Sequence, residues 1–173
     1  DVPSGSGSLS AEDFASAVAE VSIAASREEV TPVLTAVMMS SSSKELSLVA
    51  TDRFRVAVKS VPWSKAAKES EVLIPARVIS EIAKTFAAGE DVHVGLGEGE
   101  KEMVGFTSGN KMVATSTIKG KYPAVLQLFP GETPHFAVLN TTDLADATKR
   151  VSLVVDRDKP IRFSFSGAEV NLE

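Results

Sequence analysis

The sequence predicts an α+β protein built from a repeated unit, in which a helix lies on one face of an antiparallel sheet. Three segments share one pattern: an apolar pair, an amphipathic helix, and strands of alternating polarity. They open at Leu9, Leu73 and Leu139, which are 64 and 66 residues apart. The matching helix positions are Phe14, Val78 and Leu144. A repeat of this length indicates that each unit buries an apolar face against its neighbour.

The first unit begins with a helix predicted from about residue 11 to residue 25. Apolar side chains recur there at helical spacing, and Ser10 is a suitable N-cap with Asp13 three residues later. Val-rich, partly alternating runs follow and predict strands. These runs are residues 33–39, 46–51 and 54–61.

The second unit opens with a predicted strand over residues 71–74. Pro75 then begins a helix that extends to about residue 87, because the first turn of a helix does not need the missing N–H of proline. The strands predicted after this helix are residues 91–96, 102–107 and 111–118.

The third unit has only part of this pattern. Its predicted elements are a strand over residues 135–139, a helix over 142–151 and strands over 161–166 and 169–172. We therefore expect a linker over residues 1–8, a complete two-unit domain over 9–130, and the first half of a further domain over 131–173. Half a domain leaves a sheet edge unpaired, so we expect the chain to be a fragment of a longer protein.

Composition excludes several classes of function. The 173 residues contain no cysteine, which excludes disulfides and thiolate metal sites. The longest apolar run, residues 33–39, is far too short to span a bilayer, and the N-terminus does not resemble a signal peptide. The net charge of −5 argues against a strongly basic nucleic-acid binder, although the distribution of charge matters more than its sum.

The sequence contains no convincing motif for a catalytic or cofactor site, so we expect no metal, no cofactor and no catalytic residue. Neither His93 nor His135 has a second histidine at metal-ligand spacing. The glycine-rich residues 95–100 join two strands and read as a hairpin loop. Asp52 beside Arg53 and Arg55 is more typical of a turn cap or an ion pair than of an acid–base pair.

One segment resembles a known family. It reads Ala50-Thr51-Asp52-Arg53-Phe54-Arg55-Val56-Ala57. It is similar to the ATD-x-x-R signature of the bacterial sliding clamp, the β subunit of DNA polymerase III. Two further segments match at the expected spacing, Leu73-Ile74-Pro75-Ala76 and Lys121-Tyr122-Pro123. The resemblance covers essentially the whole chain, as the middle domain and the start of the third, and the region of Trp63 looks most like actinobacterial clamps.

The resemblance implies a DNA-clamp fold and a cytoplasmic, non-catalytic processivity factor. Such clamps are head-to-tail homodimers that encircle duplex DNA and do not involve a membrane. Their partners would be polymerase subunits, the clamp loader and repair proteins that carry a short peptide of the Gln-Leu-x-Leu-Phe kind. Two other functions stay open: a small α/β enzyme with an anion pocket lined by Arg53 and Arg55, and a repeat-built interaction module without a DNA role.

The resemblance also implies two groups of site residues. The partner-peptide pocket would comprise Leu34, Thr51, Arg53, Phe54, Arg55, Val56, Pro123 and Leu128. The face toward the DNA channel would comprise Arg77, Lys84, Lys149 and Arg150. The family often has Gly, and then His or Tyr, where this chain has Arg53 and Phe54, and often has Arg where this chain has Gln127.

The residues themselves allow a simpler account of both groups. The apolar pocket members could be ordinary core residues. Arg77 and Lys84 lie two helical turns apart on one side, where Glu81 could bridge them as a solvated face. The first helix carries acidic rather than basic residues on its exposed side.

Overall fold

The computed structural model describes residues 7–64, 69–88, 90–96, 103–129, 131–156 and 159–173. The chain divides into two compact units, Asp1–Phe129 and Pro130–Glu173. Helices and antiparallel sheets form the described part, so the α+β class predicted from the sequence is confirmed.

The first unit combines two antiparallel sheets with two helices. One sheet has the strand order β4-β3-β2-β5 and the other has the order β1-β6-β7-β8. The strands of the first sheet are β2 (Ala36–Ser41), β3 (Glu45–Thr51), β4 (Val56–Pro62) and β5 (Ser70–Pro75). Those of the second are β1 (Gly7–Leu9), β6 (Val92–Leu96), β7 (Met103–Ser108) and β8 (Lys111–Ser116). Short 3₁₀ helices cover Pro32–Thr35 and Val125–Leu128.

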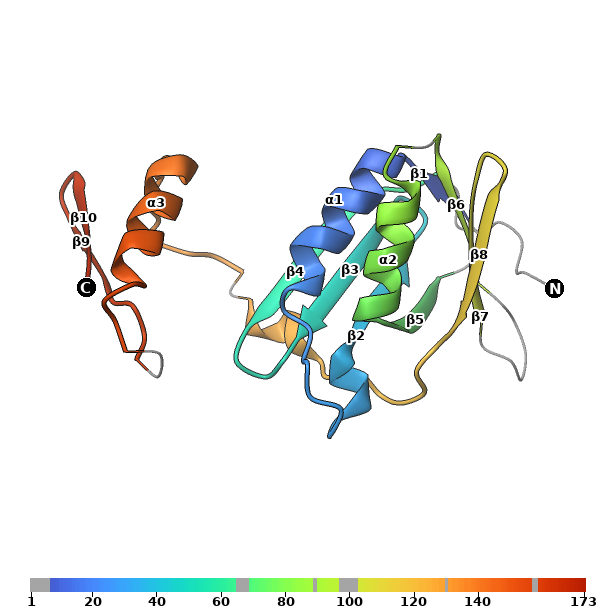
Figure 1. Cartoon of the computed structure of the whole chain (residues 1–173), viewed down its shortest axis with the longest axis horizontal. Helices are drawn as coiled ribbons and strands as arrows, with labels where there is room; N and C mark the ends of the chain where they lie inside the picture. Colours follow the sequence, from blue (N-terminus) through green and yellow to red (C-terminus); the bar gives the residue numbers. More distant parts are fainter. Residues whose placement is uncertain (1–6, 65–68, 89, 97–102, 130, 157–158) are drawn as a thin grey trace. The chain divides into compact units, whose positions relative to one another are not determined.

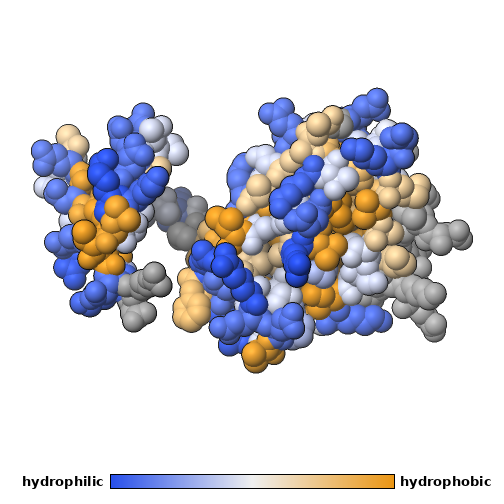
Figure 2. Space-filling model, in the orientation of Figure 1, coloured by the Kyte–Doolittle hydropathy of each residue, from blue (hydrophilic) through white to orange (hydrophobic). Residues whose placement is uncertain are grey.

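The helices α1 (Ala11–Ser22) and α2 (Ala76–Phe86) lie side by side in Figure 1 and pack against each other. Helix α1 rests on β3 and β4, while α2 rests on β2 and β5. Figure 2 shows hydrophilic side chains along the exposed side of this helix pair. The apolar sides therefore face the sheets, as amphipathic helices require.

The buried positions of α1 and α2 correct the register of the repeat. The buried pairs are Phe14 with Ile79, Ala17 with Ile82, Val18 with Ala83, and Val21 with Phe86, each 65 residues apart. Val78, which the sequence analysis matched to Phe14, is only partly buried. The register follows from the caps, since each helix begins one residue after its cap, Ser10 or Pro75.

The main core lies beneath the two helices and takes residues from both sheets. Phe14 of α1 is fully buried there, and its ring centroid lies 5.6 Å from that of Phe106 on β7. Leu48, Ile74 and Val104 are also fully buried. The contact between Phe14 and Phe106 joins the first helix to the second sheet, so both sheets share one core.

A second, smaller core lies on the opposite face of the sheet that contains β2. Ala36 and Met38 point into it, while Val37 and Met39 point toward the helices. Strand β2 is thus buried on both faces, which explains why its sequence is apolar without alternation. This outer face is covered by residues 117–129, the covering segment, which follows β8. Tyr122 and Val125 are its buried residues.

Several boundaries differ from the sequence predictions. The strand predicted over residues 54–61 begins only at Val56, and the one predicted over 111–118 ends at Ser116. Residues 33–35 form part of a 3₁₀ turn rather than a strand, with the Thr35 hydroxyl donating to the Pro32 carbonyl at 2.8 Å. Helix α1 ends at Ser22 rather than near residue 25. Gly7 and Ser8, predicted as linker, pair with Val94 and His93 of β6. The last of these differences depends on pairing with a distant strand, which local propensity does not contain.

The second unit contains α3 (Thr141–Val151) and a hairpin of β9 (Phe163–Ser166) and β10 (Glu169–Leu172). The Asn140 side chain caps α3 by accepting from the Thr142 and Asp143 N–H groups. The predicted strand over residues 135–139 is wrong, because no described strand pairs with it. None of the unit's described residues is buried, and Phe136 is 86% exposed. In the described part of the chain, no helix has the length and apolarity needed to cross a membrane.

Candidate functional site

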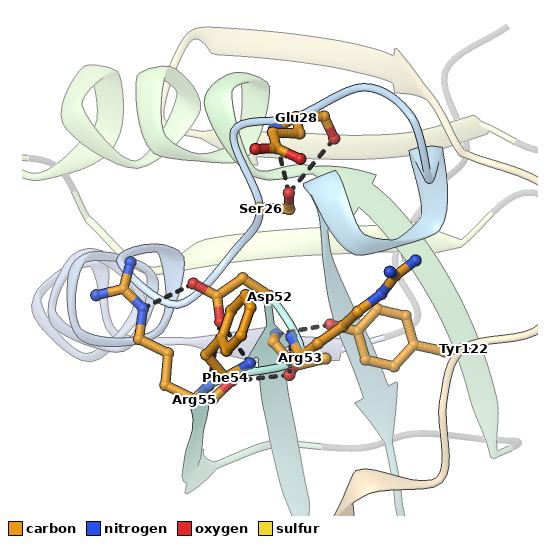
Figure 3. Close-up of polar contacts among 8 residues, drawn as sticks. Ser26, Glu28, Asp52, Arg53, Phe54, Arg55 and Tyr122 are labelled. Atoms are coloured by element: carbon orange, nitrogen blue, oxygen red, sulfur yellow. Dashed lines mark hydrogen bonds and ion pairs between the residues drawn. The ribbon is translucent and has the colours of Figure 1, made fainter. Parts of the chain in front are cut away.

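The turn between β3 and β4, residues 52–55, is built around one carboxylate. Asp52 Oδ1 accepts hydrogen bonds from the N–H groups of Phe54 and Arg55, each at 3.1 Å. Its other oxygen, Oδ2, forms an ion pair with Arg55 Nε at 3.0 Å (Figure 3). The prediction that Asp52 acts as a turn cap is confirmed. An aspartate in this position orders a short turn by replacing backbone partners with its side chain.

The ionisation of Asp52 fits this structural role. Its partial burial acts to raise the pKa, but the Arg55 and Phe54 N–H groups and the Arg55 guanidinium outweigh burial and lower the pKa below its ordinary value. The side chain is therefore ionised at neutral pH and holds the turn. The stability it adds is present above the unfolded-state pKa and is lost as pH falls through the lowered one.

Arg53 has an unusual backbone conformation. Its φ is 80°, and no other non-glycine residue in the described ranges has a positive φ. Its N–H donates to Thr51 Oγ1 at 3.2 Å, and Thr51 Oγ1 itself donates to the Arg55 carbonyl at 2.7 Å. The side chain reaches Thr31, where Nη2 donates to Oγ1 at 2.8 Å. These bonds fix the left-handed residue at the tip of the hairpin.

The turn presents apolar surface beside its charges. Phe54 is 96% exposed, and Leu128 of the covering segment is 71% exposed. Pro123 is also exposed, and Val56 is partly buried. The ring of Phe54 is thus available for contact with a partner.

The remaining residues predicted for the pocket lie inside the unit. Leu34 and Thr51 are buried, Leu34 within the 3₁₀ turn and Thr51 at the end of β3. They position the neighbouring backbone rather than offer surface. Of the predicted residues, 53–55 form the turn, while Thr51 ends β3 and Val56 begins β4 on either side of it.

Tyr122 ties the covering segment to this turn, and the sequence analysis did not assign it to the site. Its hydroxyl accepts a hydrogen bond from the Thr51 N–H at 3.0 Å, across 71 residues of sequence (Figure 3). Tyr122 is 5% exposed, and it directly precedes Pro123. Its position in the Lys121-Tyr122-Pro123 motif was the sequence feature that could have assigned Tyr122 to the site.

We expect Tyr122→Phe to destabilise the first unit by about 1–3 kcal/mol, because the buried Thr51 N–H loses its acceptor. Burial raises the pKa of Tyr122 above its ordinary value of 10.0, although the Thr51 N–H acts in the opposite direction. The native protein should therefore keep the tyrosine's contribution below about pH 10 and lose it as pH rises through the raised value. Urea unfolding followed by the single tryptophan, Trp63, at about pH 8 and about pH 11 measures both effects.

Lysine titration affects the native and Tyr122→Phe proteins alike, so the difference between the two pH profiles isolates Tyr122. A variant that loses as much stability above about pH 10 as the native protein does would contradict this assignment.

The basic residues predicted for the DNA-channel face are exposed. Lys84 on α2 forms an ion pair with Glu81 at 2.8 Å, and this contact lowers the pKa of Glu81. Arg77, on the same side of α2, makes no ion pair with a described residue. On α1, Glu20 pairs with Lys59 at 2.9 Å. The other two predicted residues, Lys149 and Arg150, are exposed in the last turn of α3 in the second unit.

The histidines are exposed on the surface. His93 lies on β6 and His135 lies before α3. Among the described residues, no group of three or more His, Cys, Asp or Glu side chains could hold a metal ion. Of the glycine-rich residues 95–100, the last four lie outside the described residues.

The fold matches solved structures of DNA polymerase clamps. The DNA polymerase sliding clamp of Pseudomonas aeruginosa superposes with a TM-score of 0.87 at 20% identity, covering 99% of this chain and 48% of that one. The DNA polymerase III beta chain of Streptococcus pneumoniae gives 0.85 at 24% identity, covering 99% and 46%. A further P. aeruginosa clamp is bound to griselimycin, with a TM-score of 0.83 at 21% identity over 100% of this chain and 50% of that one. The fold is that of the sliding clamps.

Sequence comparison narrows the class to one family. Residues 8–124 match the family model described as DNA polymerase III beta subunit, central domain. The beta sliding clamp of Micrococcus luteus is 35% identical over 100% of this chain and 56% of its own length, and that of Streptomyces coelicolor is 35% identical over 99% and 47%. The chain belongs to the DNA polymerase III beta subunit family. It spans about half the length of these curated relatives.

Proposed function

We propose that the protein containing this chain is a sliding clamp, a non-catalytic and cytoplasmic processivity factor that encircles duplex DNA as a homodimer. It tethers polymerase subunits, the clamp loader and repair proteins through a peptide pocket that includes the β3–β4 turn. The observation that carries this proposal is the match of residues 8–124 to the central domain of the family. Tethering raises the local concentration of a partner at DNA without any chemistry in the tether.

The turn has the properties that a peptide site needs. Phe54 and Leu128 offer exposed apolar surface for leucine and phenylalanine side chains of a partner. The turn that carries Phe54 is held by the Asp52 hydrogen bonds, so little ordering is needed on binding. Asp52 is already engaged with Arg55, which suits a turn cap better than an acid or base.

The contact with DNA is proposed to be weak and independent of sequence. Arg77 and Lys84 are exposed on one side of α2 and can approach phosphates, while α1 beside it carries Glu12, Asp13 and Glu20. A ring retains DNA by enclosure, so its basic residues need only a loose electrostatic contact.

The peptide site is tested by titrating a labelled Gln-Leu-x-Leu-Phe peptide with the 173-residue chain and reading fluorescence polarisation. We expect a dissociation constant on the order of micromolar or weaker, as for a short peptide with few anchors. The double variant Phe54→Ala, Leu128→Ala should bind at least about tenfold more weakly, because each lost anchor costs about 1 kcal/mol or more.

The matched control is Ile23→Ala, Met112→Ala. It also removes two exposed apolar side chains of the first unit, 67% and 63% exposed, but neither belongs to the proposed pocket. All four side chains are exposed, so both proteins should fold. Equal binding by the two double variants would remove the pocket from the β3–β4 turn.

A further inference from the structure

The backbone at Arg53 would suit glycine better than arginine. A left-handed conformation costs an ordinary residue about 1–2 kcal/mol, whereas glycine adopts it freely. The chain nevertheless places an arginine at φ 80°. Strain of this kind persists where the surrounding structure fixes it, and it is enriched at functional sites. The side chain is therefore the feature to explain.

The two arginines of the turn differ in how their charges are balanced. Arg55 is paired with the carboxylate of Asp52 at 3.0 Å. Arg53 leaves the turn in the opposite direction (Figure 3) and forms no ion pair with any residue in the described ranges. Its contact with Thr31 uses one of the five N–H donors of the guanidinium. The positive charge of Arg53 is thus held in place and left open to a partner.

Arg53 and Phe54 are consecutive residues of the turn, and both side chains are exposed. We propose that Arg53 selects partner peptides that carry a carboxylate beside their apolar anchor. The inference rests on the proposed peptide site and names the chemistry of its partner. A guanidinium binds a carboxylate through two parallel hydrogen bonds, while the ring of Phe54 packs against the neighbouring apolar side chain.

A phosphate could also pair with a guanidinium, but the surroundings of Arg53 favour a peptide. Phe54 is almost fully exposed and gives apolar contact that a phosphodiester chain does not use. Arg55 is already engaged with Asp52, so the turn offers one open guanidinium, which matches a single carboxylate better than the row of phosphates in a nucleic acid.

The test compares three amidated peptides on the 173-residue chain: Gln-Leu-Ser-Leu-Phe with neutral flanks, with a glutamate before it, and with a glutamate after it. At low salt we expect at least one glutamate peptide to bind about two- to fivefold more tightly than the neutral one, the range of an exposed ion pair. The preference should shrink as salt rises. In Arg53→Gly the preference for the glutamate peptides should disappear.

Arg53→Gly should also fold at least as well as the native chain, because glycine accepts φ 80° without strain. Lys44→Ala is the matched control. It removes one exposed positive charge from the β2–β3 turn, at the other end of β3, and should keep the preference. Thr31→Val removes the hydroxyl that holds Arg53 and should reduce the preference without abolishing it.

The outcomes separate the two proposals. Binding of all three peptides without any preference, or a preference that survives Arg53→Gly, overturns the role of Arg53 and leaves the peptide site standing. Binding of none of them overturns both. A short DNA duplex that competes with the peptides in the native chain but not in Arg53→Gly would assign Arg53 to phosphate and overturn this proposal.

Discussion

Replacing Phe14 by alanine is expected to lower the free energy of unfolding of the first unit by about 3–5 kcal/mol. Phe14 has no exposed surface, and its ring contacts Phe106 on the second sheet. Alanine would leave a cavity at the point where α1 meets that sheet. Urea unfolding monitored by Trp63, which lies in the same core, measures the loss.

Ile23→Ala serves as the control for this prediction. Ile23 directly follows the end of α1 and is 67% exposed, so its truncation should change stability by less than about 0.5 kcal/mol. A loss of under about 1 kcal/mol in Phe14→Ala would mean that the helix does not anchor the core as described.

The helices could be predicted from the sequence because the spacing of their apolar residues reveals which face is buried. Phe14, Val18 and Val21 recur at helical spacing, and the structure buries all three. The caps were equally local, since Ser10 accepts from the Asp13 N–H at 3.0 Å. Local signals of this kind do not need the rest of the fold.

Strand predictions were less secure because a strand exists only with a partner. Residues 136–139 are a continuous apolar run, but no described strand pairs with them and Phe136 stays exposed. The sequence around Gly7 and Ser8 is typical of a linker, yet both residues pair with β6 in the second sheet. Whether such a segment forms a strand depends on pairing with a distant segment, which a local sequence pattern cannot predict.

In the candidate site, too, local contacts could be predicted from the sequence and long-range contacts could not. The Asp52 cap spans three residues and was predicted. The contact of Arg53 with Thr31 spans 22 residues, and that of Thr51 with Tyr122 spans 71, so neither could be read from the motif. The family resemblance identified the members of the turn, while the left-handed backbone of Arg53 emerged only from the structure.

Gly120→Ala is expected to destabilise the first unit by about 2–4 kcal/mol and to weaken peptide binding. Gly120 has a φ of 144°, which costs a residue with a side chain about 1–3 kcal/mol. A Cβ added there would lie 2.6 Å from Val33 Cγ1, and a β-branched valine cannot easily turn aside. The segment that follows Gly120 carries Tyr122, Pro123 and Leu128.

Gly109→Ala is the matched control, because Gly109 also has a positive φ, 56°, but open space around its Cβ. It should lose only the backbone cost of about 1–2 kcal/mol and keep its peptide affinity. Adding Val33→Ala to Gly120→Ala should cost less stability than Val33→Ala costs alone, since the clash is then relieved. Trp63-monitored unfolding and peptide polarisation measure the four proteins together. Equal losses in Gly120→Ala and Gly109→Ala would show that Val33 does not constrain the covering segment, and unchanged peptide affinity in Gly120→Ala would separate that segment from the binding site.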